Sequence, residues 1–165
     1  MIGTARRALA RILASVSSAG PTDGGDEPGR FQVQYRPDPD GRPDPGEVVW
    51  TWVPFEEDRT QGKDRPVLIM GRHAEHLLGL MLTSKDHDRD LAREAASGRI
   101  WMDLGAGPWD RQGRPSEVRL DRVLRLDPAR VRREGATLDR PRFDAVAAAM
   151  GAALGWTRDD GNHTA

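Results

Sequence analysis

The sequence predicts a mainly β domain, in which a small, strongly bent β-barrel carries one packed C-terminal helix. Two observations support this fold class. Five short apolar segments of strand length follow one another after residue 46, separated by charged or Gly- and Pro-rich loops, and an amphipathic helical pattern comes last. Several short strands followed by a single helix are typical of a small barrel with the helix packed against it.

The first 45 residues differ in composition from the rest of the chain. Residues 1–17 place apolar side chains at helical spacing with three arginines among them, which predicts a short amphipathic helix. Residues 18–45 are rich in Pro, Gly and Asp, and only residues 31–35 alternate weakly like a strand. Such a stretch buries too little apolar surface to offset its ordering entropy, so we expect a disordered linker. A barrel domain over residues 46–158 and a tail over residues 159–165 complete the expected organisation.

The predicted strands follow in order. Residues 46–53 are apolar on both faces, which predicts a buried strand. Residues 66–70 and 77–82 are two further apolar runs, and their connection is short enough for a hairpin. Residues 99–104 alternate as a fourth strand, and residues 116–126 form a fifth with one apolar face.

Two helices are expected in the domain. Residues 90–96 favour a short helix within a highly charged segment. The clearest helix begins after Asp139, which can cap it, and Pro141 suits its first turn. Its apolar stripe consists of Phe143, Val146, Met150, Ala153 and Leu154.

Composition excludes several classes of protein. The chain has 165 residues and no cysteine, which excludes disulfide scaffolds, zinc ribbons and thiol nucleophiles. No apolar run reaches the roughly 20 residues of a membrane span, and the first 17 residues contain too many arginines for a signal-peptide core. We therefore expect a cytoplasmic protein without membrane contact. Walker loops, HExxH and Gly-x-Ser-x-Gly motifs are missing from the sequence.

The net charge of −1 conceals an uneven distribution. Residues 18–45 contain six acids and three arginines, whereas residues 111–142 contain ten arginines and five acids. Of the 25 basic residues 23 are arginine, whose planar guanidinium suits phosphate and can stack on a base. A GC-rich genome and a solvated surface explain the arginine bias equally well. The domain itself is not broadly basic, so any RNA contact is expected in a local arginine-rich groove.

One arrangement of residues points to phosphodiester chemistry. Arg65 begins one strand of the predicted hairpin and Thr83 ends the other, which brings both side chains to the same edge of the sheet. An arginine and a hydroxyl at a shared strand end can hold a phosphodiester. His73, Glu75 and His76 are too weak a pattern to indicate a metal site, so we expect none.

The same residues lie in segments that resemble the MazF/PemK (Kid) toxins of type II toxin–antitoxin systems. The resemblance covers roughly residues 46–156 and rests on segments 46–50, 62–69, 82–84, 114–123 and 126–131, in the family's order and spacing. It implies an SH3-like (CcdB/MazF-type) barrel, a homodimer and an antitoxin with a disordered C-terminal segment. It also implies a cofactor-free, metal-independent endoribonuclease (mRNA interferase), a hydrolase that cleaves single-stranded RNA by attack of the ribose 2′-OH, leaving 2′,3′-cyclic phosphate and 5′-OH ends.

By similarity, Arg65 and Thr83 occupy the positions of the family's catalytic arginine and threonine. We expect Ser84, His87, Arg122 and Trp109 to contact RNA, with Trp109 stacking on a base or else buried as a loop anchor. His87 or His73 is a candidate for proton transfer.

The sequence also departs from the family's pattern. Thr60 stands where some relatives have a functional acid, and Arg122 stands where many have glutamine. A non-catalytic SH3-like module that binds protein or nucleic acid is therefore the alternative. Gyrase inhibition as in the CcdB branch is less favoured, because only Trp156 is available for the tryptophan contact on which that branch relies.

Overall fold

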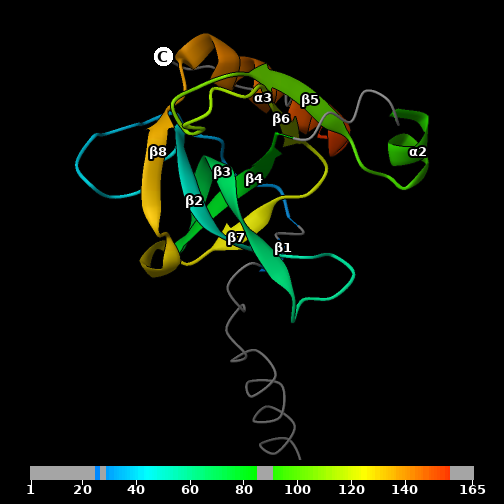
Figure 1. The fold of residues 1–165 in the computed structure, drawn as a ribbon, viewed down its shortest axis with the longest axis horizontal. Coiled ribbons are helices and arrows are strands. Elements are labelled where there is room, and N and C mark those ends of the chain that lie inside the picture. The colour runs from blue at the N-terminus through cyan, green and yellow to red at the C-terminus, as the bar shows by residue number, and fades with distance from the viewer. Residues whose placement is uncertain (1–24, 27–28, 85–90, 157–165) are drawn as a thin grey trace, which may run out of the picture.

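The structure is a computed structural model that describes residues 25–26, 29–84 and 91–156 (Figure 1). A curled β-sheet carries one long helix near the C-terminus, which confirms the predicted fold class. The expected N-terminal helix, His87 and the tail lie outside the described residues. None of the described helices is long and apolar enough to span a bilayer.

The strands form one strongly bent sheet. Its main path runs β1-β7-β4-β3-β2-β8, and β5 pairs with β6, which in turn pairs with β4. All of the pairings are antiparallel. The strand bounds are β1 Gly25–Asp26, β2 Glu47–Pro54, β3 Gly62–His73, β4 His76–Thr83, β5 Trp101–Gly105, β6 Ser116–Arg119, β7 Leu124–Leu126 and β8 Arg133–Thr137.

β2, β3 and β4 form the centre of the sheet because their side chains are buried on both faces. Alternate residues enter different cores: Val48 packs with Leu68 on one face, and Val49 packs with Val67 on the other. The expected hairpin is β3–β4, where His73 pairs with His76. Ala74 in the two-residue turn has φ 52°, a left-handed conformation typical of such tight turns.

The predicted fifth strand is broken into β6 and β7. Both pieces pair with β4, but their registers do not match. The pairing of Leu82 with Val118, if continued, would place Gly79 opposite residue 121, whereas Gly79 pairs with Leu124. Three residues are thus inserted between the two pieces. This insertion is longer than a one-residue β-bulge, and like a bulge it bends the sheet and reorients side chains next to the break.

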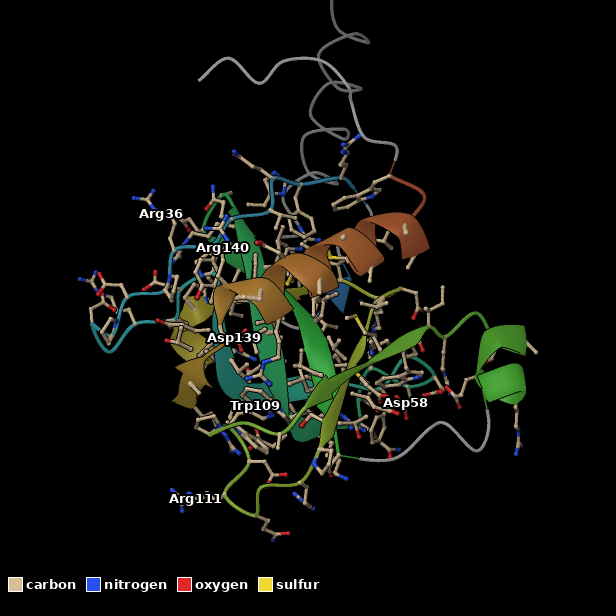
Figure 2. The ribbon with its side chains drawn as sticks, turned by 90° about the horizontal axis from the view of Figure 1, so that it is seen from above. Arg36, Asp58, Trp109, Arg111, Asp139 and Arg140 are labelled. Atoms are coloured by element: carbon tan, nitrogen blue, oxygen red, sulfur yellow. The ribbon has the colours of Figure 1, made fainter. Side chains whose placement is uncertain are left out.

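Helix α3, Arg140–Ala153, covers one face of the sheet (Figure 2). Asp139 caps it by accepting a hydrogen bond from the backbone N–H of Arg142 at 3.1 Å, as the sequence predicted. Phe143, Val146 and Met150 form its buried stripe and complete the larger core. The shorter helices are α2, Leu91–Ala96, and the 3₁₀ helix η2, Pro128–Arg130.

Residues 31–45, expected within the linker, instead pack onto the barrel. Phe31 and Tyr35 contact the core under α3, and the Tyr35 hydroxyl donates to the carbonyl of Leu138 at 2.8 Å. The backbone N–H of Gln34 donates to the carbonyl of Met70, and Gly71 leaves room for the passing chain, since a Cβ there would lie 2.6 Å from the Gln32 carbonyl oxygen. Three spaced aromatic or aliphatic side chains anchor a segment whose average composition is that of a linker. We call residues 29–45 the strap.

Candidate active site

A pocket of about 610 Å³ opens where the ends of β2 and β4 meet the beginning of β3. We call it the arginine pocket. The expected site residues Arg65, Thr83, Ser84 and Arg122 all line it. Its other lining residues are Val53, Pro54, Phe55, Glu56, Glu57, Lys63, Met81, Glu94, Arg99, Trp101 and Arg119.

Arg65 and Thr83 meet through the register of the central hairpin. Val67 pairs with Met81, and the same register continued by two residues places Arg65 opposite Thr83. Opposite residues of an antiparallel pair project to the same face of the sheet. The cross-strand neighbour of Thr83 on its other side is Glu117 of β6. The hairpin therefore supplies an arginine and a buried threonine to one wall of the pocket.

Arg65 is the half-buried cation of this pocket that lacks a counter-ion among the described residues. Within that part of the chain its guanidinium makes no hydrogen bond or ion pair. Burial first, and then the positive charge of Arg122, lower the pKa of Arg65 below its ordinary value. Two guanidinium groups held near each other and partly removed from water favour an anion between them. Arg65 is thus placed to bind a phosphate group.

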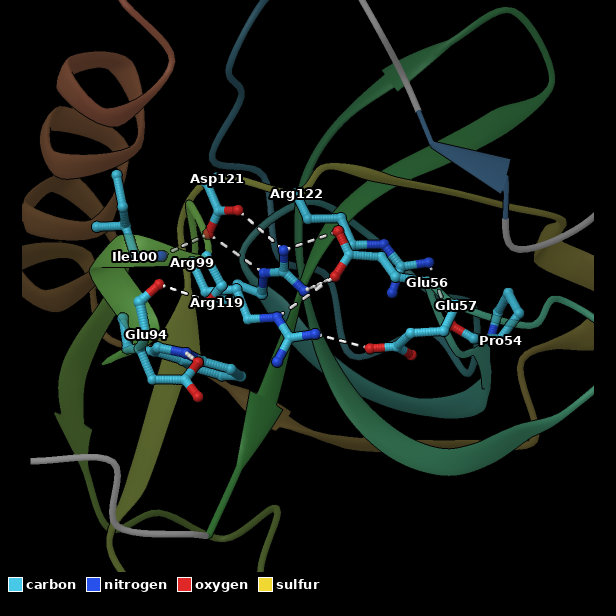
Figure 3. A network of polar contacts seen from close by, with 11 residues as sticks. Pro54, Glu56, Glu57, Glu94, Arg99, Ile100, Arg119, Asp121 and Arg122 are labelled. Carbon is cyan, nitrogen blue, oxygen red and sulfur yellow. Dashed lines mark hydrogen bonds and ion pairs between the residues drawn. The ribbon is translucent and has the colours of Figure 1, made fainter. Parts of the chain in front are cut away.

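Arg119 occupies a different position, because two carboxylates hold it (Figure 3). Its side chain is only 5% exposed, and its terminal nitrogens donate to both oxygens of Glu56 at 2.8 and 2.9 Å. Asp121 accepts two further bonds from the same guanidinium. Burial alone would lower the pKa of Arg119, but the bonds to Asp121 and Glu56 outweigh it and raise that pKa. Arg119 therefore remains a fixed cation.

The segment after β2 closes one side of the pocket through ion pairs. Arg99 donates to Glu57 at 2.7 Å and lies 3.6 Å from Glu56 (Figure 3). Arg122, itself buried, donates to the carbonyl of Pro54 at 3.1 Å. Hydrogen bonding from Arg119 lowers the pKa of Glu56, so Glu56 is ionised at neutral pH. This segment thereby presents carboxylates beside the cations of the pocket.

Other expected site residues lie elsewhere. Trp109 is 1% exposed and its indole N–H donates to the Ser116 hydroxyl within the larger core, so the ring is a loop anchor, and the prediction that it stacks on RNA is wrong for this structure. His73 and His76 lie at the far end of β3 and β4 from Arg65 and Thr83. His87 falls outside the described residues. Among the described residues, no group of three potential metal ligands occurs.

Sequence reasoning did not single out Arg119, Asp121 or Glu56. The available signal was the alternation in residues 116–121, where Glu117, Arg119 and Asp121 share the face opposite Val118 and Leu120. The alternation alone does not show that this polar face is buried. In the structure Glu117 and Arg119 are buried, and Arg119 bonds to Glu56 just after the end of β2.

Residues 44–154 match the family model of the PemK-like, MazF-like toxins of type II toxin–antitoxin systems. The chain belongs to this family. Among solved structures, the MazE–MazF complex (Form II) of Deinococcus radiodurans is 20% identical and has a TM-score of 0.50, with 72% of this chain and 100% of that chain covered. This likeness shows the MazF-type fold.

Another solved structure that matches the chain is the Mycobacterium tuberculosis toxin MazF-mt6. It is 21% identical, with a TM-score of 0.45, and the match covers 67% of this chain and 98% of that chain. No curated protein matches the sequence.

Proposed function

We propose that this PemK/MazF-family protein is a metal-independent endoribonuclease toxin that cleaves single-stranded RNA. The observation that carries the proposal is the arginine pocket, where the half-buried Arg65 faces Thr83 across the hairpin without a counter-ion among the described residues. Family membership supports the same activity. Because messenger RNA is the proposed substrate, the cytoplasm is the proposed place of action.

The proposed reaction is an internal transesterification. The ribose 2′-oxygen forms a bond to the adjacent phosphorus as the bond from phosphorus to the 5′-oxygen breaks, leaving a 2′,3′-cyclic phosphate and a 5′-OH. Arg65 stabilises the negative charge that develops on the phosphoryl oxygens, because it is a preorganised donor in a partly dry site. Thr83 orients the 2′-OH by hydrogen bonding.

Two protons move in this reaction. The 2′-OH loses one, and Glu56 is the proposed acceptor because it lines the pocket as an ionised carboxylate. The 5′-oxygen gains one as it leaves, and water in the open pocket is the proposed donor. Arginine is a weak acid, so Arg65 and Arg119 act as electrostatic groups in this scheme.

Two substitutions test the proposal directly. Arg65→Ala should lower kcat about 10²–10³-fold, the usual cost of removing one such donor. Thr83→Ala should also lower kcat, and Thr83→Ser, which keeps the hydroxyl, should recover most of it. Arg111→Ala is the matched control, since Arg111 is an exposed arginine in the loop before β6, away from the pocket (Figure 2). Near-UV circular dichroism should show that each variant is folded.

The chemistry is tested on the products. Single-stranded RNA of mixed sequence, incubated with the protein and EDTA, should give fragments with cyclic phosphate and 5′-OH ends by mass spectrometry. Fragments with 5′-phosphates, or activity that disappears with EDTA, would contradict the transesterification. Wild-type activity in Arg65→Ala would contradict the assigned role of Arg65.

A non-catalytic binding module is the second candidate, and one observation favours it. Glu56 occupies the guanidinium fork of Arg119 with two parallel bonds, the geometry with which arginine binds a phosphate. Such a pocket, with part of its cationic charge already neutralised, can still bind RNA, but it stabilises the negative charge of the transition state less. Tight RNA or protein binding with no cleavage of any mixed-sequence RNA would support this alternative.

The proposed partners are a second copy of the chain and a cognate antitoxin. The Deinococcus radiodurans relative was solved as a MazE–MazF complex. We propose an antitoxin whose C-terminal segment is disordered when free and folds on binding. Light scattering should show a dimer of the 18.2 kDa chain, and co-expression with the antitoxin should abolish RNA cleavage.

A further inference from the structure

The arginine pocket has an apolar side that the proposed chemistry does not use. Val53, Pro54, Phe55, Met81 and Trp101 line it beside the cations. An RNA nucleotide has the same two parts, an anionic phosphate and a base with flat apolar faces. Proteins that bind single-stranded RNA commonly stack such bases on aromatic side chains next to a cationic groove.

Trp101 is the aromatic residue best placed for a base. It is the first residue of β5, and its cross-strand neighbour is Arg119 of β6, so both side chains project to the same face of the sheet. Trp101 is half-buried and packs against the smaller core, which includes Val53 and Met81. The Trp101 side chain is therefore packed against the smaller core on one side, and its remaining surface lines the pocket.

The orientation of this ring is fixed by a polar contact. The indole N–H of Trp101 donates to a carboxylate oxygen of Glu94 in α2 at 3.1 Å. A stacking platform that is already held in place loses little conformational entropy when it binds. Glu94 lines the same pocket, so its carboxylate lies near any base that stacks on Trp101.

The other tryptophans, all within the described residues, do not line the pocket. Trp109 is buried in the larger core, and the Trp50 indole N–H donates to the Trp109 carbonyl. Trp52 is 48% exposed but lies against Gly62, outside the pocket lining. Trp52 is thus a matched control, an exposed tryptophan on β2 that does not line the pocket.

We propose that Trp101, oriented by Glu94, forms a nucleobase subsite that holds a base flanking the scissile phosphate of single-stranded RNA. This subsite rests on the proposed function and assigns the base-stacking role to Trp101 in place of Trp109. It sets affinity and the preference for one base, whereas Arg65 and Thr83 act on the phosphate. Loss of the subsite therefore changes KM and base preference far more than kcat.

The test uses a short RNA made uncleavable by 2′-O-methyl groups, whose sequence is chosen from a site that the wild-type protein cuts. If no site is cut, a mixed-sequence oligomer serves for binding. Trp101→Leu should weaken binding about 10- to 100-fold, the range expected for loss of one stacked base. Trp101→Phe should keep most of the affinity, and Trp52→Leu should bind as the wild type does.

An abasic scan separates stacking from a general loss of affinity. At one RNA position, an abasic site should weaken binding to the wild-type protein as much as the Trp101→Leu substitution weakens binding of the intact RNA. The same abasic site should cause no further loss of affinity in the Trp101→Leu protein. Glu94→Ala releases the ring without changing the core, and it should weaken binding about 2- to 5-fold. If Trp101→Leu fails to fold, Trp101→Phe, Glu94→Ala and the wild-type scan still test the subsite.

The outcomes distinguish the subsite from the enzyme. If the wild type cleaves RNA and Trp101→Leu keeps the wild-type affinity and KM, the subsite proposal is overturned and the endoribonuclease proposal stands. The subsite is also overturned if, at every scanned position, the loss from the abasic site adds to the loss from Trp101→Leu. Binding that shows the Trp101 dependence without any cleavage overturns the endoribonuclease and keeps the subsite. A wild type that neither binds nor cleaves RNA overturns both.

Discussion

Glu56 links the chemistry of the pocket to its stability, because its carboxylate holds Arg119 through two hydrogen bonds. As the proposed proton acceptor, it should be needed for turnover. Glu56→Gln keeps the shape of the side chain and should lower kcat about 10²-fold or more, within the usual range for a general base. Glu57→Gln is the matched control, because within the described part of the chain Glu57 pairs with Arg99 alone, and its side chain is 69% exposed. Equal losses in both variants would argue against a specific role for Glu56.

The same carboxylate predicts how stability changes with pH. The hydrogen bond from Arg119 lowers the pKa of Glu56 below its ordinary value of 4.5. Because the pKa is lower in the folded state, the ionised Glu56 carboxylate stabilises the fold above about pH 4.5. This stabilisation is lost as the pH falls through the lowered pKa. Glu56→Gln should cost about 1 kcal/mol at pH 7, since Glu56 is partly exposed and Asp121 still holds Arg119.

Urea denaturation at pH 7 and at pH 3.5 measures this difference. The stability difference between the wild type and Glu56→Gln should be smaller at pH 3.5 than at pH 7, because the contribution of the ionised carboxylate begins to be lost below its ordinary pKa of 4.5. A difference that stays constant between the two pH values would show that the ionised carboxylate is not what stabilises this contact.

Single residues of the site were predictable to different degrees. Arg65 and Thr83 could be placed together because a short hairpin connection fixes the register of its strands. Trp109 could not be placed, since a tryptophan between Pro108 and Asp110 has the same sequence signature whether it is exposed or anchors a loop. Its burial depends on Gly107, where a Cβ would lie 2.1 Å from the Trp109 ring.

At the scale of elements, the contribution of the strap to the stability of the domain can be measured directly. The family match begins at residue 44, so most of this segment lies outside it. Tyr35 anchors the strap through its hydroxyl bond to Leu138 and a ring contact with Phe143 at 5.0 Å between centroids. Tyr35→Phe should cost about 1 kcal/mol, because the buried carbonyl of Leu138 loses its side-chain partner. Tyr35→Ala should cost about 2–4 kcal/mol.

Urea unfolding, with the exposed Arg36 changed to Ala as the control, measures these costs (Figure 2). The control should stay within about 0.5 kcal/mol of the wild type. A Tyr35→Ala protein as stable as the wild type would show that the strap is not part of the folded domain.

The elements also show where local patterns stop being informative. β8 has little apolar alternation, and it forms because β2 offers an unpaired edge, with Glu47 opposite Thr137. The break between β6 and β7 contains neither Gly nor Pro to mark it, since residues 120–123 are Leu-Asp-Arg-Val. The break arises from the different registers with which the two strands meet β4. Long-range pairing of this kind leaves no local signal, and yet it places Arg119 in the pocket.

At the scale of the whole molecule, a net charge of −1 indicates that RNA affinity arises locally. Five cations line the arginine pocket, but Arg99 and Arg119 are paired with carboxylates. Lys63 and Arg65 make no hydrogen bond or ion pair with another described residue. RNA binding should therefore neutralise only about two or three phosphates. A single strand then gives a slope of log K against log salt of about −1.5 to −2.

Fluorescence anisotropy of a labelled, uncleavable RNA at about 50 to 300 mM salt measures this slope. The Debye length over this range is on the order of 10 Å. Lys63→Ala should make the slope shallower by about 0.7, the value for one phosphate contact on a single strand, while Arg111→Ala should leave it unchanged. A slope of about −4 or steeper would require an extended basic surface. The arginines between residues 111 and 142 would then contribute to binding as a group, and the RNA would run well beyond the pocket.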